Sequence, residues 1–280
     1  MKRKKVAVIG VGLLGGSLAL ALKRTGRWKV VGWNHRATSR RRAAKILTVA
    51  RSLEDAVRGA DAVVLCAHTK AVLSMLCEIT PWLGKNTLVM DVSSLKGPLV
   101  REAARIPGIK GRFVPCHPMA GKEKSGPEAS DKDLYRGKYV FVTPFSETKS
   151  STAVRAAAFW KSLGARVLFW TPQRHDQRVA LTSHLPHLLA CVMMERFGLS
   201  SRKDSQLKAA VGTGFRDFTR IAAGNPAMWA DILTLNAPEI SKALGLFRKR
   251  LQALEKDVRA KRRSKWLRFF ENARTLREKL

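Results

Sequence analysis

Hydrophobic residues follow two different patterns along the 280-residue chain. Through the first 171 residues, short apolar runs alternate with segments whose apolar residues recur every three or four positions. The short runs are typical of buried β-strands, and the other segments are typical of helices packed on a sheet. Strands that alternate with helices need crossover connections, so the pattern predicts a parallel sheet. The predicted strands are residues 5–9, 29–33, 61–67, 87–92, 113–115, 139–142 and 166–170, with the first helix over residues 17–24.

The pattern changes after Thr171 and Pro172. From Gln173 onward no run has the character of a strand, and apolar residues recur at helical spacing. Glycine and proline separate these helical segments, as they do between helices in general. We therefore expect an α/β domain over residues 1–171 and an all-helical domain over residues 172–280.

A glycine-rich turn follows the first predicted strand. Gly10, Gly12 and Gly15 have the spacing GxGxxG, and a predicted helix comes next. In a Rossmann-type domain the first glycine permits a tight turn, the second lets a pyrophosphate approach the backbone, and the third lets helix and strand pack closely. The N–H groups at the start of the helix, around Leu13 and Leu14, then face the phosphates. This context predicts a nicotinamide dinucleotide site in a Rossmann-type fold, and therefore an oxidoreductase.

The residues after the second predicted strand bear on the choice of cofactor. NAD-binding domains usually place an acidic residue here, which hydrogen-bonds to the adenosine ribose. This chain has Asn34 instead, followed by His35 and Arg36. Without the carboxylate nothing repels a 2′-phosphate, and Arg36 offers a charged partner for one. We expect these three residues to contact the cofactor, and we favour NADP over NAD.

Composition adds one unusual property, a net charge of +32. Residues 23–45 hold many basic residues and no acid. Such a charge is typical of nucleic-acid-binding proteins, but these usually add exposed aromatic residues or a recognisable reading motif. Neither is found here. We interpret the charge as a solvated basic surface and expect no specific nucleic-acid partner.

The remaining bulk properties indicate a soluble, cytoplasmic protein. No apolar run reaches the roughly 20 residues that a membrane span needs. The basic N-terminus is followed by an apolar stretch interrupted by glycines, without a cleavage site, which argues against a signal peptide. The four cysteines show no paired spacing, so neither a disulfide framework nor a metal site is expected.

Further motifs follow the glycine loop along the chain. They are DVSSLK at residues 91–96, HPMAG at 117–121, TSHLPH at 182–187, and GFRDFTRIA at 214–222 with PAMW at 226–229. Together with the glycine loop these motifs extend over nearly the whole chain. On this basis the chain resembles the prephenate/arogenate dehydrogenase family of tyrosine biosynthesis.

The resemblance implies an NAD(P)-dependent oxidative decarboxylation, of prephenate to 4-hydroxyphenylpyruvate or of arogenate to tyrosine. His117 matches the family's catalytic histidine, which hydrogen-bonds to the 4-hydroxyl, and an imidazole titrates near working pH. Ser94 matches the serine beside that histidine, and Arg220 matches the arginine that binds a substrate carboxylate. Ser183 and His184 match the contribution of the helical domain to the substrate side chain. No residue of the sequence decides between prephenate and arogenate.

Other residues near these motifs receive supporting roles. The resemblance places Lys96 and Glu123 at orienting positions, and it places His175 and Asp176 in a contact that shapes the pocket. We interpret Trp229 as a core residue rather than a ligand contact.

The resemblance also implies a small-molecule substrate and a homodimer formed through the helical domain. The chain ends soon after that domain, so we expect no appended regulatory domain. Two other interpretations stay open. A different two-domain NAD(P)-dependent hydroxyacid dehydrogenase would need a catalytic lysine in the helical domain. A basic, Rossmann-derived nucleic-acid-binding protein would bind polyanions with a steep dependence on salt.

Overall fold

The N-terminal part of the chain is built on a six-stranded parallel sheet. The computed structural model describes residues 3–122, 124 and 126–280. The strand order is β3-β2-β1-β4-β5-β6, and every neighbouring pair is parallel, which confirms the predicted sheet. The strand β3 was not predicted, because two residues carry no periodic signal. The strands are β1 Lys4–Ile9, β2 Trp28–Trp33, β3 Thr48–Val49, β4 Ala62–Leu65, β5 Leu88–Asp91 and β6 Phe113–Val114.

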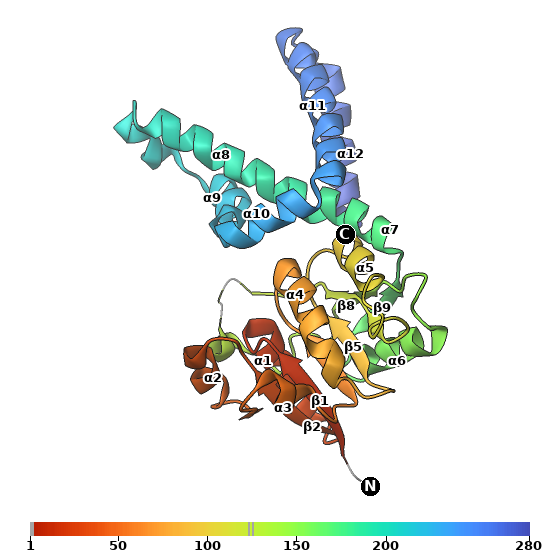
Figure 1. Ribbon diagram of the computed structural model, residues 1–280. Coiled ribbons are helices and arrows are strands. Elements are labelled where there is room, and N and C mark those ends of the chain that lie inside the picture. Colours follow the sequence, from red (N-terminus) through yellow and green to blue (C-terminus); the bar gives the residue numbers. More distant parts are fainter. Residues whose placement is uncertain (1–2, 123, 125) are drawn as a thin grey trace.

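Helices cover both faces of this sheet (Figure 1). Along β1 the side chains alternate, so that Val6 and Val8 pack with α1 and α6 while Ala7 and Ile9 pack with α3, α4 and α5. The first helix begins at Leu13, before the predicted start, because the glycine turn leads directly into it. The helices are α1 Leu13–Arg24, α2 Ala37–Ala43, α3 Leu53–Val57, α4 Thr69–Ile79, α5 Gly97–Ala103 and α6 Ser150–Lys161, with short 3-10 turns at Thr80–Trp82 and Pro127–Ala129.

Three later strands form a second, smaller sheet in the order β7-β8-β9. They are β7 Cys116–Pro118, β8 Tyr139–Val142 and β9 Arg166–Phe169. The pair β7 and β8 is antiparallel, whereas β8 and β9 are parallel. The sequence predicted β8 and β9 as strands but neither their separate sheet nor β7. The three residues of β7 include a proline and show no strand pattern, yet this strand carries His117.

The remainder of the chain is helical and lies above the carboxyl ends of the parallel strands (Figure 1). In the same view α8 and α11 diverge from a common base, and α12 runs back beside α11, where Arg250 lies over the Phe269 ring. Among the described residues, no helix is long and apolar enough to cross a membrane. The elements are α7 Pro172–Val179, a π-helical turn Ala180–His184, α8 Leu185–Ser201, α9 Thr213–Thr219, α10 Pro226–Leu235, α11 Ala237–Arg259 and α12 Arg263–Glu278, with 3-10 turns at Ser205–Ala210 and Arg220–Ala223.

Candidate active site

Glycine stands at each of three positions of the loop after β1 for a different geometric reason. Gly10 has a φ of +97°, and a Cβ on it would lie 2.3 Å from the carbonyl oxygen of Cys66. A Cβ on Gly15 would lie 2.1 Å from the carbonyl oxygen of Gly10, so only glycine lets α1 pack this close to the turn. In the described part of the chain, a Cβ on Gly12 would have no neighbour within 4 Å apart from the adjoining residues. Open space at this glycine, at the start of α1, fits a pyrophosphate that approaches the backbone.

Alanine at Gly12 and alanine at Gly15 are expected to have different effects. The added methyl of Gly12→Ala meets no atom of the described residues beyond its chain neighbours, so thermal stability is expected to stay unchanged while the dissociation constant for a nicotinamide dinucleotide rises about tenfold or more. Gly15→Ala forces a Cβ against backbone and is expected to cost at least about 1 kcal/mol of stability. Differential scanning calorimetry and isothermal titration calorimetry measure the two properties. Unchanged cofactor affinity in Gly12→Ala would remove this loop from the site.

The residues after β2 have divided roles. Asn34 accepts a hydrogen bond on its Oδ1 from the backbone N–H of Val11 at 2.7 Å, so its side chain supports the glycine loop. Arg40 donates to the carbonyl oxygens of residues 34 and 35, and the Arg42 guanidinium pairs with the Glu128 carboxylate at 2.5 Å. Arg36 is exposed and lines a cavity together with the glycine loop. Of these three arginines, Arg36 is therefore the one placed to meet a ligand.

That cavity, of about 550 Å³, runs along the carboxyl ends of β1, β4 and β5. One side is the start of α1 with Arg36, and the opposite side is α10 of the helical part. Asp231 of α10, which lines the cavity, pairs with Lys70 at 2.5 Å near the start of α4. Ligands of parallel α/β sheets bind at this edge, and the cavity extends from the phosphate end of a dinucleotide site to Ser94.

A second cavity, of about 260 Å³, adjoins the first and shares Ser94, Met228 and Ile232 with it. Both domains contribute to its wall. The N-terminal domain supplies Ser94 and residues 117–121, and the helical part supplies Ser183, His184, Met228, Trp229 and Ile232. Four residues that the sequence singled out, Ser94, His117, Ser183 and His184, thus meet in one place. Trp229 lines the cavity too, which corrects its interpretation as a core residue; its ring stacks on His187 with centroids 3.5 Å apart.

Two other predicted site residues do not join this group. Arg220 is exposed at the start of its 3-10 turn and is not part of the wall of either cavity. His35 is exposed and packs edge-on against Trp33, outside the wall of the dinucleotide cavity. Glu123 lies outside the described residues. The roles of Arg220 and His35 stay predictions.

A buried ion pair holds β7 in place beneath the second cavity. The Lys96 ammonium lies 2.6 Å from Asp91 Oδ2 and donates to the carbonyl oxygen of Cys116 at 2.7 Å, and both charged side chains are fully buried. Asp91 also accepts from the backbone N–H groups of Cys116 and Ser93. The orienting position predicted for Lys96 therefore has a structural basis, because the pair ties β5 to the strand of His117. The role of Asp91 was missed, although it stands in the same motif.

His117 belongs to a chain of three side chains. Its Nδ1 lies 2.9 Å from Nε2 of His175, and Nδ1 of His175 lies 2.8 Å from Oδ1 of Asp176. The Asp176 carboxylate also accepts from the backbone N–H groups of residues 96 and 97 at the start of α5. Burial lowers the pKa of His117 well below its ordinary value, and the nearby His175 and Lys96 lower it further. Burial also lowers the pKa of His175, so both rings are neutral at pH 7.

His184 is held by a residue that sequence reasoning missed. Asn236 donates through Nδ2 to the backbone carbonyl of Asp176 at 3.0 Å, and the same nitrogen lies 3.2 Å from Nδ1 of His184. The carbonyl only accepts, so Nδ2 is the donor in both contacts. Nδ1 of His184 therefore accepts, and the neutral ring carries its proton on Nε2. Burial lowers the pKa of His184 to about 4, so the ring stays neutral near pH 7.

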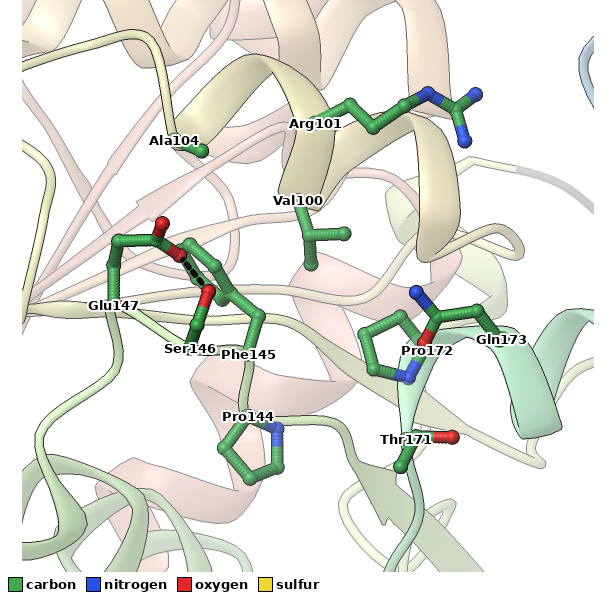
Figure 2. Close-up of a pocket in the computed structure, with 10 residues that line it drawn as sticks. All are labelled: Val100, Arg101, Ala104, Pro144, Phe145, Ser146, Glu147, Thr171, Pro172 and Gln173. Carbon is green, nitrogen blue, oxygen red and sulfur yellow. Dashed lines mark hydrogen bonds between the residues drawn. The ribbon is translucent and has the colours of Figure 1, made fainter.

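Another cavity, of about 480 Å³, lies between α5, the segment after β8 and the start of α7 (Figure 2). Figure 2 shows Pro144, Phe145 and Pro172 around it, with Arg101 pointing outward and Ser146 hydrogen-bonded to Glu147 at 2.5 Å. None of the described residues that line this cavity was singled out for chemistry by the sequence. Ser94, His117, Ser183 and His184 line the other two cavities.

Comparison with known proteins matches both parts of the chain. The family model described as "Prephenate dehydrogenase, nucleotide-binding domain" matches residues 18–169. The model described as "Prephenate dehydrogenase, dimerization domain" matches residues 171–272. The first match begins after the glycine loop, so the assignment of that loop rests on its geometry.

Individual relatives agree with these models. A cyclohexadienyl dehydrogenase of Zymomonas mobilis is 32% identical over 250 residues, which are 87% of this chain and 85% of that protein. The crystal structure of Aquifex aeolicus prephenate dehydrogenase with hydroxyphenyl propionate and NAD+ superposes with a TM-score of 0.92 at 31% identity, covering 100% of this chain and 99% of that one. Synechocystis arogenate dehydrogenase superposes with a TM-score of 0.84 at 26% identity, covering 98% and 99%.

Proposed function

Because this chain belongs to the prephenate dehydrogenase family, we propose that it catalyses the NAD(P)-dependent oxidative decarboxylation of prephenate or arogenate in tyrosine biosynthesis. One observation carries the proposal. The cavity that holds His117 and His184 opens at Ser94 onto the cavity that begins at the glycine loop. A substrate held at His117 therefore lies beside a cofactor held along the sheet edge, which is the arrangement that a hydride transfer needs.

The reaction combines a proton transfer, a hydride transfer and a decarboxylation. In a cyclohexadienol substrate the 4-hydroxyl gives up a proton, which His117 accepts on Nε2. The bound nicotinamide supplies the acceptor for the C4 hydride. The ring carboxylate leaves as CO2, the electrons of the broken C–C bond complete the aromatic ring, and the proton returns to the phenolate oxygen. Because aromatisation drives the reaction, positioning and proton removal are what the side chains add. We propose Arg220 as the cation that holds a substrate carboxylate, on the strength of its motif.

His184 bears on the choice between prephenate and arogenate. Its neutral ring presents an N–H donor from Nε2, since Asn236 donates to the other nitrogen. The 2-oxo group of prephenate only accepts hydrogen bonds, whereas the ammonium of arogenate only donates them. A fixed donor in the cavity that His117 also lines therefore supports a preference for the 2-oxo side chain.

Arg36 supports a preference for NADP over NAD. It is exposed and lines the dinucleotide cavity beside the glycine loop, and the chain has no acid at the end of β2, where Asn34 stands. A 2′-phosphate placed there would meet a guanidinium, and the usual carboxylate at the end of β2 is replaced by Asn34.

The helical domain supports assembly into a homodimer. Its family model is that of a dimerization domain, and it exposes large apolar side chains on the diverging helices α8 and α11. Such side chains normally mark a surface that another protein covers. They include Val192, Met193, Met194, Leu199, Leu244, Leu246, Leu251 and Val258.

The alternative hydroxyacid dehydrogenase finds no support at this site. It would need a catalytic lysine from the helical domain. The described residues through which that domain lines the two cavities are Ser183, His184, Asn225, Ala227, Met228, Trp229, Asp231 and Ile232, and none is a lysine.

Steady-state rates of nicotinamide reduction test the proposal, with prephenate and arogenate each combined with NAD and NADP. We expect turnover with a higher kcat/KM for prephenate and for NADP. Arg36→Ala is expected to lower kcat/KM with NADP about tenfold and to leave NAD within about twofold, because a hydrogen bond between charged groups contributes about 1.5–3 kcal/mol. Arg42→Ala is the matched control, since its side chain is paired with Glu128 and lies outside the cavity wall.

Each part of the proposal has its own contradicting result. If neither substrate reduces either cofactor, the proposed reaction is wrong. A wild-type preference for NAD, or an Arg36→Ala variant with unchanged use of NADP, would remove the 2′-phosphate contact. A preference for arogenate would contradict the role given to His184.

A further inference from the structure

The contact between His117 and His175 joins the two domains at the site of the chemistry. His117 lies on β7 of the second sheet, and His175 lies on α7, the first helix of the helical part. The two rings meet edge to face with centroids 5.0 Å apart, and Phe141 of β8 packs edge-on against His175 at 5.6 Å. His175 is fully buried, so no water competes for its two nitrogens.

Hydrogen-bond donors and acceptors assign a proton to one nitrogen of each ring. The two carboxylate oxygens of Asp176 accept from backbone N–H groups, and Nδ1 of His175, which faces Oδ1, donates to it. A neutral His175 then has an unprotonated Nε2, which accepts from Nδ1 of His117. With its proton on Nδ1, the neutral His117 ring has a lone pair on Nε2. That is the nitrogen that must be free to take a proton from a substrate hydroxyl.

We propose that His175 and Asp176 are positioning residues that hold His117 in the Nδ1–H tautomer and keep its Nε2 available as the base. The same contacts persist after His117 has taken the proton from the substrate hydroxyl. Protonated His117 still donates from Nδ1 to His175, whose Nδ1–H remains directed at the Asp176 carboxylate. The chain thus orients the imidazolium and places a negative charge at its far end.

The other charged and titratable groups around His117 do not provide this orientation. Lys96 lies beneath it and is held by Asp91 and the Cys116 carbonyl, so its ammonium repels a proton on the ring instead of accepting one. His184 lines the same cavity as His117, and its Nδ1 accepts from Asn236. Among the described residues, His117 Nδ1 donates its hydrogen bond to His175, and the effect therefore depends on that one acceptor.

The test compares two substitutions of His175 with a control. His175→Phe keeps a buried ring but has no acceptor, and we expect kcat to fall about 10²-fold or more with the KM values within about threefold. His175→Gln offers an amide oxygen near the place of Nε2 and is expected to retain at least ten times the kcat of the Phe variant. His187 is another buried histidine of the helical domain and lies outside the cavity wall. His187→Phe keeps an aromatic ring beside Trp229, so it is the matched control and is expected to stay within about threefold of wild type.

A spectroscopic readout separates positioning from a general loss of packing. Two-bond ¹H–¹⁵N spectra of histidine-labelled protein report which ring nitrogen of His117 is protonated, and the signals that disappear in His117→Asn identify this residue. We expect the Nδ1–H tautomer in wild type and in His175→Gln, and a shift toward Nε2–H in His175→Phe. An Nε2–H tautomer in wild type, or a kcat of His175→Phe within threefold of wild type, would overturn the proposal.

This inference rests on the proposed function only for its kinetic part. If the wild-type protein turned over neither substrate, the proposed function would fail, while the tautomer would still be read from the spectra. If the protein is active and the tautomer of His117 does not change when His175 is replaced, only the positioning role of His175 and Asp176 is wrong.

Discussion

Replacing His117 with Asn is expected to lower kcat by about 10²–10⁴-fold, the range that a positioned general base usually contributes. Asn keeps a polar group near the place of Nδ1 but has no nitrogen that accepts a proton. The backbone of β7 and the Asp91–Lys96 pair beneath it are unchanged by the substitution, so the KM values are expected to stay within a few fold. Pre-steady-state and steady-state measurements of nicotinamide reduction with saturating substrate give the comparison. A kcat within threefold of wild type would show that another group takes the proton.

The pH profile gives an independent check of the same residue. The base must be unprotonated, and burial lowers the pKa of His117 well below its ordinary value. The wild-type kcat/KM is therefore expected to be level through neutral pH and to fall only as the pH drops through that lowered pKa, on the acid side of a free histidine. His117→Asn is expected to lose this acid limb. A wild-type profile that falls near the ordinary pKa of histidine would contradict the burial of this group.

Lys96→Met is expected to cause the largest loss of stability, about 3–5 kcal/mol, because it leaves the Asp91 carboxylate buried without its counter-charge. The Asp91 carboxylate keeps its hydrogen bonds from the backbone. The loss of stability therefore comes from the missing positive charge and not from lost hydrogen bonds to the backbone. Urea unfolding followed by circular dichroism measures the change. The double variant that adds Asp91→Asn is expected to recover part of the lost stability, since it removes the unpaired charge.

Lys70→Met serves as the matched control for this experiment. It removes the same type of cation, but the Lys70 side chain is 56% exposed and its partner Asp231 is only partly buried. Solvent already screens this pair, so the expected change is within about 1 kcal/mol. Equal losses of stability in the two Lys→Met variants would mean that burial does not increase the cost of breaking the Asp91–Lys96 pair.

Much of the fold follows from short stretches of the chain read separately. The apolar runs at β1, β2, β4, β5 and β8 were found because several adjacent residues each bury a side chain, and the signal adds up along the run. The strands β3 and β7 were missed because two or three residues carry too little pattern. Their conformation comes from pairing with a neighbour, as His117 pairs with Phe141 of β8.

The site likewise contains residues that the sequence identified and one that it did not. Gly10, Gly12 and Gly15 were found because a tight turn and a close approach restrict single positions to glycine. Ser94 and His117 were found as members of motifs. Asn236 gave no signal, since it contacts Asp176 and His184 from far along the chain and belongs to none of the quoted motifs.

The arginines after β2 show why neighbouring residues of one type have different roles. In the sequence, Arg36, Arg40 and Arg42 are three similar cations. In the structure one contacts backbone carbonyls, another pairs with Glu128, and Arg36 lines the cavity. Glu128 is distant in sequence, so no local pattern distinguishes Arg42 from Arg36.

The sequence by itself determined the two-part organisation, the parallel sheet and the residue types that carry the chemistry, because periodic burial and the conformational demands of glycine act on neighbours in the chain. Only the tertiary structure decided which of those residues meet, and in which protonation state. The tautomer of His117 depends on His175 and Asp176, and that of His184 depends on Asn236. Hydrogen-bond direction is a property of atoms within about 3 Å of each other, and the fold alone brings those atoms together.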